Sequence, residues 1–551
     1  MFSIKTKLSL LFFFISSLQL AGQSLNKEKI FTHADTLKGT LSKARIWWDV
    51  QQYKILIEPD FNKKTIAGKV DIKFKATGVY DTMQIDLQAP MEINKVYLGE
   101  ESLRYVRDEN AYFIILSKPL QIGSENTLAL SFSGKVTEAI RPPWDGGWIF
   151  SRDKNGNPWM SVACQGLGAS VWYPCKDHQS DEPDKGALLR ISTPDSLMGV
   201  GNGRLIGKHQ YKPGWTVYDW EVKNPINNYN IVPYIGKYVR FGETYKGEKG
   251  NLDCEYWVLD YELEKAKLQF KQVPLMLKAF EHWFGPYPFY EDGFKLVQSP
   301  HLGMEHQSAV AYGNGFQNGY RGRDLSGSGW GLKWDFIIVH ESGHEWYGNN
   351  ITSKDLADMW LHEGFTNYSE TLFTDYYYGK EAGNAYVQGT RKLIRNDAPI
   401  IAKYNVNDQG SGDMYYKGGN LVHFVRQLFD NDEKFRDAIR EMNKKFYHQT
   451  VTSGEIEHFL SVKVNRNLRP LFDQYLRNTS IPTLEIQKSK KEIQYRWTDC
   501  LASFDAPVRV IIGKELKWIY PTTNWKTLKG NTNINSISVD KNFYVGYKEI
   551  K

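Results

Sequence analysis

The chain has 551 residues, of which 41% are hydrophobic, and a formal net charge of +6. That length predicts roughly two to four domains with sizeable cores and excludes a single small module. The charge is small for this size, and no Lys- or Arg-rich run is typical of a nucleic-acid-binding surface, so we expect no nucleic-acid partner.

The N-terminus has the pattern of a secretory signal peptide. Lys5 and Lys7 precede an apolar run from Leu8 to Phe14, and the small residues Ala21 and Gly22 follow. We therefore expect residues 1–23 to be removed and the protein to be exported to a periplasm or to the extracellular space. The alternative is an N-terminal anchor, but the run is short for a membrane span, and the mature chain has no other candidate span.

The four cysteines are Cys164, Cys175, Cys254 and Cys500, and none belongs to a Cys-x-x-Cys pair. A zinc site built from cysteines is therefore not expected. In an oxidising compartment, Cys164 and Cys175 could close a short loop with a disulfide, or both thiols could stay free.

Residues 24–245 are predicted to form an antiparallel β domain. Apolar residues alternate with polar ones, as at Tyr53, Ile55 and Ile57, and turn residues separate the runs. Within this range, residues 164–184 are rich in Gly, Pro and Asp and predict a long functional loop.

Residues 246–478 are predicted to form a mostly helical domain, because apolar residues recur at helical spacing. A Gly-rich stretch at 313–331 is expected to form a mobile loop at the rim of the functional site. Alternation returns after Pro482 and predicts a small β-sandwich at 479–551. The fold class is therefore multidomain α+β. The later helices are expected at Met359–Tyr378, Glu381–Asn396, Gly418–Phe429, Glu433–Phe446, Gly454–Val462 and Leu468–Arg477.

One motif, from His340 to His344, predicts the chemistry. Two histidines four positions apart lie on the same face of a helix, where they can share one Zn²⁺ ion. A catalytic zinc needs a third protein ligand and one open position, and Glu363, on an aromatic-rich helix after a turn, can supply the third ligand. We expect one Zn²⁺ held by His340, His344 and Glu363, with Glu341 as the general base that acts on water.

The neighbours of Glu363 are expected to take other roles. His362 is predicted to project away from the metal. Asn367 and Glu370 follow Glu363 by four and seven positions, so they could orient the ligands.

These residues resemble the zinc aminopeptidases of the aminopeptidase N and leukotriene-A hydrolase type. The resemblance includes the extended stretch Val339–Asn349 and the run Trp360–Phe365, where the family usually has Asn in place of His362. It covers nearly the whole chain after residue 23 and implies a β saddle, a thermolysin-like catalytic domain and a small β module. Many members continue with a helical C-terminal domain, which we do not expect in this chain.

The resemblance also implies substrate-binding residues. Leu302-Gly303-Met304-Glu305-His306 is similar to the family's Gly-Ala-Met-Glu-Asn motif, although positions 302, 303 and 306 differ. By this match Glu305 binds the free α-amine of the substrate, and Gly303 and Met304 contact the substrate beside it. Gln165, ahead of the run Trp172–Cys175, resembles a family Gln that lines the first substrate pocket.

A third signature, Tyr415-Tyr416-Lys417-Gly418, fits the family pattern Tyr-x-Lys-Gly. It implies that Tyr415 stabilises the negative charge that develops on the scissile carbonyl oxygen. Tyr416 is expected to be a packing residue.

The sequence thus predicts a zinc-dependent aminopeptidase that acts on peptides with a free N-terminus. One alternative is a zinc endopeptidase, which would not need Glu305. Another is a non-catalytic zinc-stabilised binding protein, which would need neither Glu341 nor Tyr415. One branch of the resembled family hydrolyses an epoxide, and no residue here marks that activity. The sequence does not specify the preferred N-terminal residue or the oligomeric state.

Overall fold

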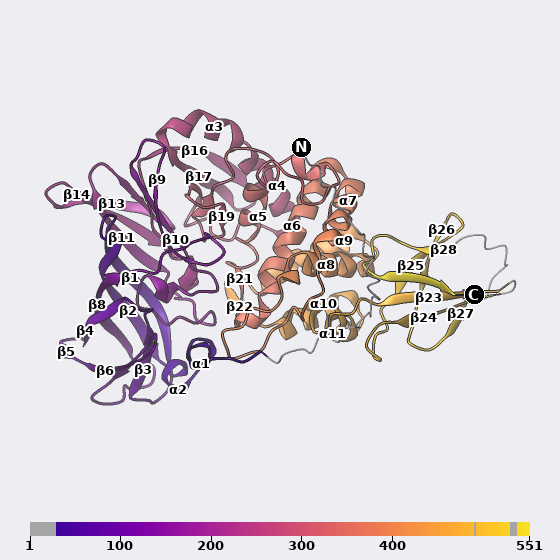
Figure 1. Ribbon diagram of the computed structural model, residues 1–551, viewed down its shortest axis with the longest axis horizontal. Coiled ribbons are helices and arrows are strands. Elements are labelled where there is room, and N and C mark those ends of the chain that lie inside the picture. Colours follow the sequence, from indigo (N-terminus) through magenta and orange to yellow (C-terminus); the bar gives the residue numbers. More distant parts are fainter. Residues whose placement is uncertain (1–28, 490–491, 529–536, 551) are drawn as a thin grey trace, which may run out of the picture.

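The computed structural model describes residues 29–489, 492–528 and 537–550, so the predicted signal peptide lies outside the described residues. Three regions follow one another along the molecule in Figure 1: a β region in purple, a helical region in pink and orange, and a second β region in yellow. This arrangement confirms the multidomain α+β fold. No helix in the described ranges is long and apolar enough to cross a membrane.

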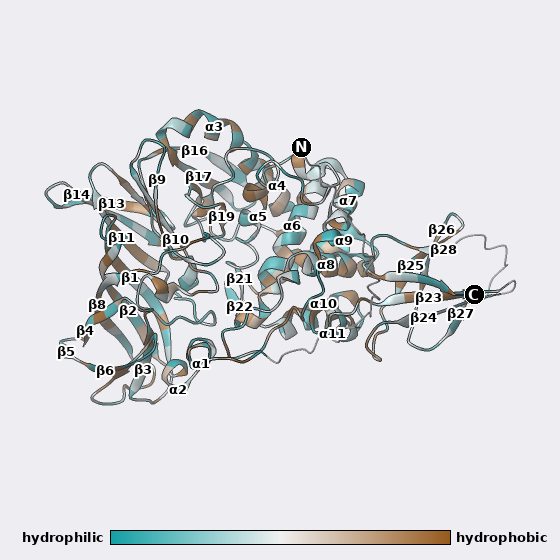
Figure 2. Ribbon diagram, viewed as in Figure 1, coloured by the Kyte–Doolittle hydropathy of each residue, from teal (hydrophilic) through white to brown (hydrophobic). Residues whose placement is uncertain are grey.

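The N-terminal β region is built on an eight-stranded sheet in the order β13-β14-β11-β1-β2-β8-β4-β5. At its centre β1 (Trp48–Asp60) pairs antiparallel with β2 (Thr65–Ala76). Buried and exposed residues alternate along β2, which is why brown and teal segments alternate along this sheet in Figure 2. The other strands of the sheet are β4 (Glu92–Leu98), β5 (Glu101–Ser102), β8 (Glu125–Lys135), β11 (Ala187–Pro194), β13 (Arg204–Lys212) and β14 (Trp215–Val222).

Two smaller sheets share one apolar core with the large sheet. They have the orders β12-β15-β10-β9 and β3-β7-β6. Their strands are β3 (Thr82–Asp86), β6 (Arg104–Asp108), β7 (Ala111–Ile115), β9 (Gly147–Arg152), β10 (Pro158–Ala163), β12 (Met198–Val200) and β15 (Tyr234–Gly236). Cys164 and Cys175 are buried in this region as free thiols.

Two short helices, α1 (His33–Gly39) and α2 (Lys43–Ile46), precede the sheet in a range that was predicted to be β. The helix α1 forms because Thr32 and Asp35 make a reciprocal capping box, which satisfies backbone donors in its first turn.

The central region begins with a five-stranded sheet in the order β16-β17-β18-β20-β19. The predicted boundary at residue 245 falls inside its first strand. β19, at the edge of the sheet, packs beside α5 (Phe336–Gly343), the helix that carries the zinc motif. The strands are β16 (Tyr238–Gly247), β17 (Gly250–Leu259), β18 (Phe294–Gln298), β19 (Gly303–Met304) and β20 (Val310–Tyr312).

Helices form the rest of the central region, and α6 (Trp360–Tyr378) is buried from Trp360 to Thr374. The predicted helix 381–396 ends earlier, at Thr390. Its continuation is diverted because Asn396 has a left-handed backbone and the carboxylate of Asp413 accepts the backbone N–H groups of Arg395 and Asn396. The other helices are α3 (Leu263–Gln269), α4 (Gln272–Phe284), α7 (Lys380–Thr390), α8 (Tyr416–Phe429), α9 (Asp432–Lys445), α10 (Ser453–Val464) and α11 (Arg469–Leu476).

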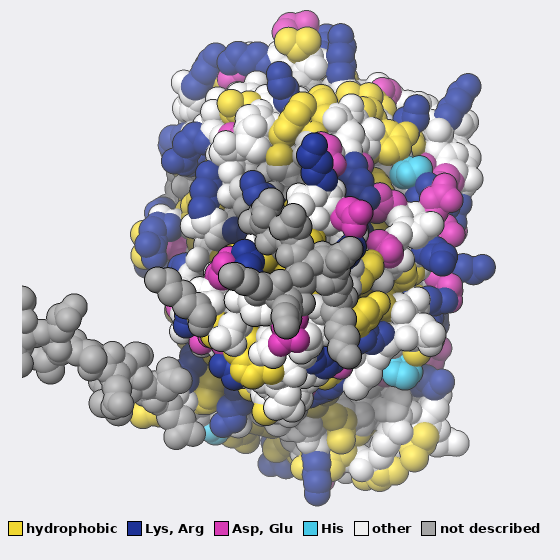
Figure 3. Space-filling view, turned by 90° about the vertical axis from the view of Figure 1, so that its right-hand side faces the viewer, with side chains coloured by type: hydrophobic (Ala, Val, Ile, Leu, Met, Phe, Trp, Pro, Cys, Tyr) yellow, Lys and Arg dark blue, Asp and Glu magenta, His cyan; other side chains and the backbone are white. Residues whose placement is uncertain are grey.

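The C-terminal region consists of two small sheets, β27-β24-β23-β29 and β26-β25-β28, as the predicted β-sandwich requires. Its core is continuous with that of the helical region. Viewed from this end, Figure 3 shows Lys and Arg interspersed with acidic and apolar side chains. The strands are β23 (Thr483–Lys488), β24 (Ile493–Thr498), β25 (Val508–Ile512), β26 (Glu515–Ile519), β27 (Lys526–Leu528), β28 (Ile537–Val539) and β29 (Gly546–Ile550).

Candidate active site

The three predicted metal ligands meet on two packed helices. His340 lies on α5, His344 caps its C-terminal end, and Glu363 lies in the first turn of α6. Oε2 of Glu363 is 3.8 Å from Nε2 of His340 and 3.4 Å from Nε2 of His344. The start of α5 is fixed by Asp335, whose carboxylate accepts the backbone N–H groups of Ile337 and Ile338. The ligands therefore rest on a well-anchored helix.

A second set of groups orients these ligands. Nδ1 of His340 is 2.7 Å from Oε1 of Glu370, and Nδ1 of His344 is 2.9 Å from the carbonyl oxygen of Tyr347. Glu370 itself accepts hydrogen bonds from Asn367 (3.1 Å) and from the Tyr386 hydroxyl (2.6 Å). Because the Nδ1 atoms are engaged in this way, both Nε2 atoms are left for a metal. The role of Tyr386 had no signal in the sequence.

This donor set fits a zinc ion. One nitrogen from each histidine and one oxygen of Glu363 lie within 4.8 Å of one another, and all three residues are buried. Oε2 of Glu363 is a buried acceptor that has no hydrogen-bond partner among the described residues, as expected for an atom meant to bind a cation. Two imidazoles and one carboxylate are a typical set for a catalytic zinc. His362 is not in the set, because its Nε2 accepts the backbone N–H of Ser353 at 2.8 Å.

Glu341 projects from α5 toward the edge strand β19. A Cβ atom on Gly303 would lie 2.6 Å from Oε1 of Glu341, so glycine at this position leaves room for the carboxylate. Burial raises the pKa of Glu341 to about 7 in the metal-free protein. A bound cation would lower it, because a nearby positive charge favours the carboxylate.

Glu305 follows β19 and is only 2% exposed. Its Oε1 accepts hydrogen bonds from Nε2 of Gln165 and from the Tyr229 hydroxyl, the latter at 3.2 Å. Both donors belong to the N-terminal β region. One oxygen or nitrogen atom from each of Glu305, Glu341 and His344 also lies within 4.8 Å of the other two. Glu305, the candidate amine-binding residue, is thus held by side chains of the N-terminal β region and lies close to the candidate metal ligands of the central region.

The altered motif positions around Glu305 have separate environments. Two of them, Leu302 and Gly303, line the same pocket as Glu305, as does the unaltered Met304. His306 is fully buried and points elsewhere, with its Nδ1 2.5 Å from the Tyr234 hydroxyl. The histidine in place of asparagine is therefore accommodated in the core of the β region.

Tyr415 immediately precedes α8, and its ring stacks at 6.1 Å from that of His340. Burial, together with the nearby carboxylates of Glu363 and Glu305, raises the pKa of Tyr415 well above its usual value. The phenol therefore stays protonated and able to donate. Tyr416, expected only to pack, also lines the pocket.

The candidate metal ligands, Glu341, Glu305 and Tyr415 all line one cavity of about 490 Å³. Its rim includes Trp144 on the loop before β9, Tyr320 and Leu325 on the Gly-rich loop, and Gln409 on the loop before α8. Trp144 is 66% exposed. Gln409 had no signal in the sequence. Among the described residues that line the cavity, the acidic ones are all glutamates, and none is Lys or Arg.

Residues 323–475 match the family described as "Peptidase family M1 domain". The chain is 24% identical over 332 residues to leukotriene A-4 hydrolase of Xenopus laevis, covering 57% of this chain and 51% of that protein. It is 21% identical over 463 residues to aminopeptidase N of Lactococcus lactis, covering 79% and 52%. The chain spans about half the length of these curated relatives.

Among solved structures, the fold is similar to that of an M1 zinc metallopeptidase from Deinococcus radiodurans. The TM-score is 0.66 at 20% identity, and the match covers 78% of this chain and 94% of that one. A variant of the same protein bound to a Tyr-Ser-Ala substrate matches with a TM-score of 0.65 at 19% identity, covering 76% and 92%.

Proposed function

We propose that this chain, which contains a peptidase family M1 domain, is a zinc-dependent aminopeptidase that removes single N-terminal residues from peptides. The observation that carries the proposal is the position of Glu305. Its carboxylate lies within 4.8 Å of both Glu341 and His344, yet it is needed neither as a ligand nor as the base. A carboxylate at that place can pair with the α-ammonium of a substrate and so fix the scissile bond one residue from the end.

Each of this chain's residues then has a defined task. A zinc ion on His340, His344 and Glu363 would polarise the scissile carbonyl and make a water molecule more acidic. The carboxylate of Glu341 takes a proton from the attacking water and delivers it to the nitrogen of the leaving amine. The Tyr415 hydroxyl donates a hydrogen bond to the carbonyl oxygen as negative charge develops there.

The edge strand β19 supports the orientation of the substrate. Gly303 and Met304 pair with β20 on one side only, so their other side is open to an extended peptide. A peptide that lies along β19 with its amine at Glu305 would place its first carbonyl near Glu341 and Tyr415.

The experiment that tests this proposal is a panel of aminoacyl-aminocoumarin substrates, each with a free and an N-acetylated amine, with a chelator control. We expect cleavage of the free-amine substrates only, and its loss with the chelator. Cleavage of blocked substrates at a similar rate would instead support an endopeptidase. Metal binding without any turnover would support a non-catalytic binding protein.

We further propose that the protein is exported, on the basis of the signal-peptide pattern at residues 1–23. N-terminal sequencing of the protein from its natural host, together with cell fractionation, tests this. A first residue near Ser24 in a periplasmic or extracellular fraction is expected, and an intact Met1 in the cytoplasm would contradict it.

A further inference from the structure

The helix α1 lies between two loops that come from different regions and both reach the active site. The first is the loop 164–168, which contains Gln165, and the second is the loop 394–411, which contains Gln409. Gln165 and Gln409 both line the catalytic cavity, and a Cβ atom on Gly166 would lie 3.5 Å from Oε1 of Gln409. The two loops therefore meet beside the amine-binding end of the site.

The contacts of α1 with the second loop involve mainly the backbone of that loop. The N–H of Asn407 donates to the carbonyl oxygen of Asp35 (3.0 Å), and the Thr40 hydroxyl donates to that of Asn405 (2.9 Å). At Gly39 the packing is so close that a Cβ atom would lie 2.1–2.5 Å from backbone atoms of Val406 and Asn407. The C-terminal end of α1 is therefore tightly packed against the loop 394–411.

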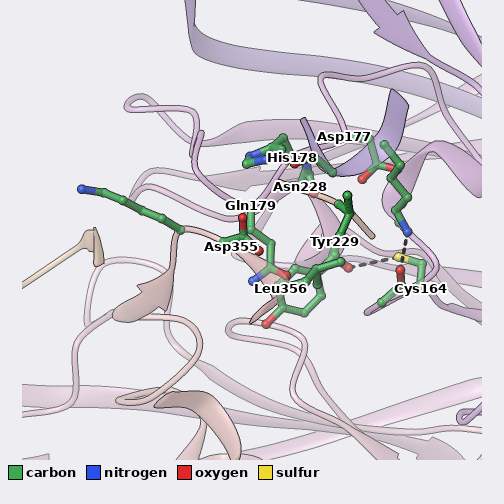
Figure 4. A pocket seen from close by; sticks show the side chains of 14 residues that line it. Cys164, Asp177, His178, Gln179, Asn228, Tyr229, Asp355 and Leu356 are labelled. Carbon is green, nitrogen blue, oxygen red and sulfur yellow. Dashed lines mark hydrogen bonds between the residues drawn. The ribbon is translucent and has the colours of Figure 1, made fainter. Parts of the chain in front are cut away.

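Among the described residues, the hydrogen bonds from α1 to the first loop are made by one side chain. The ammonium of Lys38 donates to the carbonyl oxygens of Gly166 and of Leu167, the latter at 2.6 Å. These are the two residues that follow Gln165. Lys38 also lines a pocket that Figure 4 shows from close by, with Cys164, Asp177 and Tyr229 around it.

The ammonium group of Lys38 bonds to the loop rather than to a carboxylate. No ion pair of Lys38 with a carboxylate is found among the described residues, so the two carbonyl oxygens are its hydrogen-bond acceptors. Burial of the ammonium lowers the pKa of Lys38, an unfavourable effect that Asp177 partly offsets. Hydrogen bonds from a charged donor are stronger than neutral ones and can hold a loop that has no strand partner.

We propose that Lys38 is a positioning residue, which holds the loop 164–168 so that Gln165 stays bonded to Glu305. This inference rests on the proposed aminopeptidase function, because it assigns Lys38 a role in binding the substrate's amine. It also gives α1 a function that the sequence did not indicate. The helix, which belongs to neither hydrophobic core, holds the amine-binding end of the site in place.

The test compares Lys38→Met with Lys38→Arg and with a control, Lys43→Met. Lys43 is an exposed lysine of α2, in the same N-terminal segment. For a free-amine aminoacyl-aminocoumarin substrate, we expect Lys38→Met to raise KM about tenfold, with kcat within about threefold and bound zinc unchanged. Lys38→Arg should recover most of the KM, and Lys43→Met should match the unmodified protein.

A double-mutant cycle separates positioning from general destabilisation. If Lys38 acts through Gln165, Lys38→Met should change KM less than about twofold when Gln165→Ala is already present. An additive effect, an unchanged KM in Lys38→Met alone, or a parallel loss of kcat and zinc would overturn the inference. An unmodified protein that cleaves no free-amine substrate would overturn the proposed function, and this inference with it. An active protein with an unchanged Lys38→Met KM would overturn the inference alone.

Discussion

Replacing Glu305 by Gln should weaken catalysis because it removes the negative charge of the carboxylate while keeping the size and the hydrogen bonds of the side chain. Oε1 of Glu305 accepts hydrogen bonds from Gln165 and Tyr229, and a glutamine carbonyl can accept both. What is lost is the negative charge that, under the proposed function, pairs with the substrate's ammonium. A hydrogen bond to a charged group contributes about 1.5–3 kcal/mol, and breaking a buried ion pair costs about 3–5 kcal/mol.

Glu305 is 2% exposed, so a bound ammonium would be largely shielded from water and the effect should exceed that of a surface pair. We expect a loss of about 2–4 kcal/mol in transition-state binding, equivalent to about 30- to 1000-fold in kcat/KM. The assay is initial-rate kinetics on a free-amine aminocoumarin substrate and its N-acetylated partner, with zinc content measured in parallel.

Two controls make the result interpretable. Zinc content should not change, because Glu305 is not in the ligand set, and any residual rate on the acetylated substrate should fall much less than the rate on the free amine. If Glu305→Gln kept kcat/KM for the free amine within about threefold, or lowered both substrates equally, the amine-binding role would be wrong.

Three further outcomes are expected. Glu341→Gln should retain zinc, measured by atomic absorption, while kcat falls by about 10²–10⁴-fold; persistent turnover would contradict its role as base. Glu370→Ala should weaken zinc affinity about 10- to 100-fold in a chelator competition, because it removes the partner of His340 Nδ1, whereas Glu381→Ala on the exposed face of α7 should not. Burial lowers the pKa of His178 to about 3, so between about pH 6.5 and pH 3 the unfolded chain binds a proton that the folded chain does not. This difference lowers the unfolding free energy by about 1.4 kcal/mol per pH unit as the pH falls through that window, and His178→Gln should reduce the slope, measured by urea titration, by that amount.

The metal-binding part of the site could be predicted because it depends on local periodicity. His340 and His344 are one helical turn apart, and Glu363 follows after a turn and one further helix. The same regularity explains why most helices lie near their predicted positions. The predicted helix instead ends early where the carboxylate of Asp413, 18 and 17 positions further along the chain, accepts the backbone N–H groups of Arg395 and Asn396.

The parts that could not be predicted depend on contacts between segments far apart in the chain. Tyr229 is 76 positions from Glu305, and Lys38 is 128 and 129 positions from the carbonyl groups that it binds. No spacing rule relates such residues, because the fold alone brings them together. Tyr416 was predicted to be a packing residue because its neighbour Tyr415 already satisfied the sequence motif. In the structure both tyrosines line the cavity.

The division of the active site between two regions has a consequence for incompletely assembled molecules. All three metal ligands and Glu341 belong to the helical region, whereas both side chains that hold Glu305 come from the β region. In a molecule whose two regions had separated, the candidate metal ligands and Glu341 would stay together on α5 and α6, whereas Glu305 would lose both side chains that hydrogen-bond to it. Under the proposed function, docking of the β region would therefore decide whether cleavage is fixed one residue from the peptide's N-terminus.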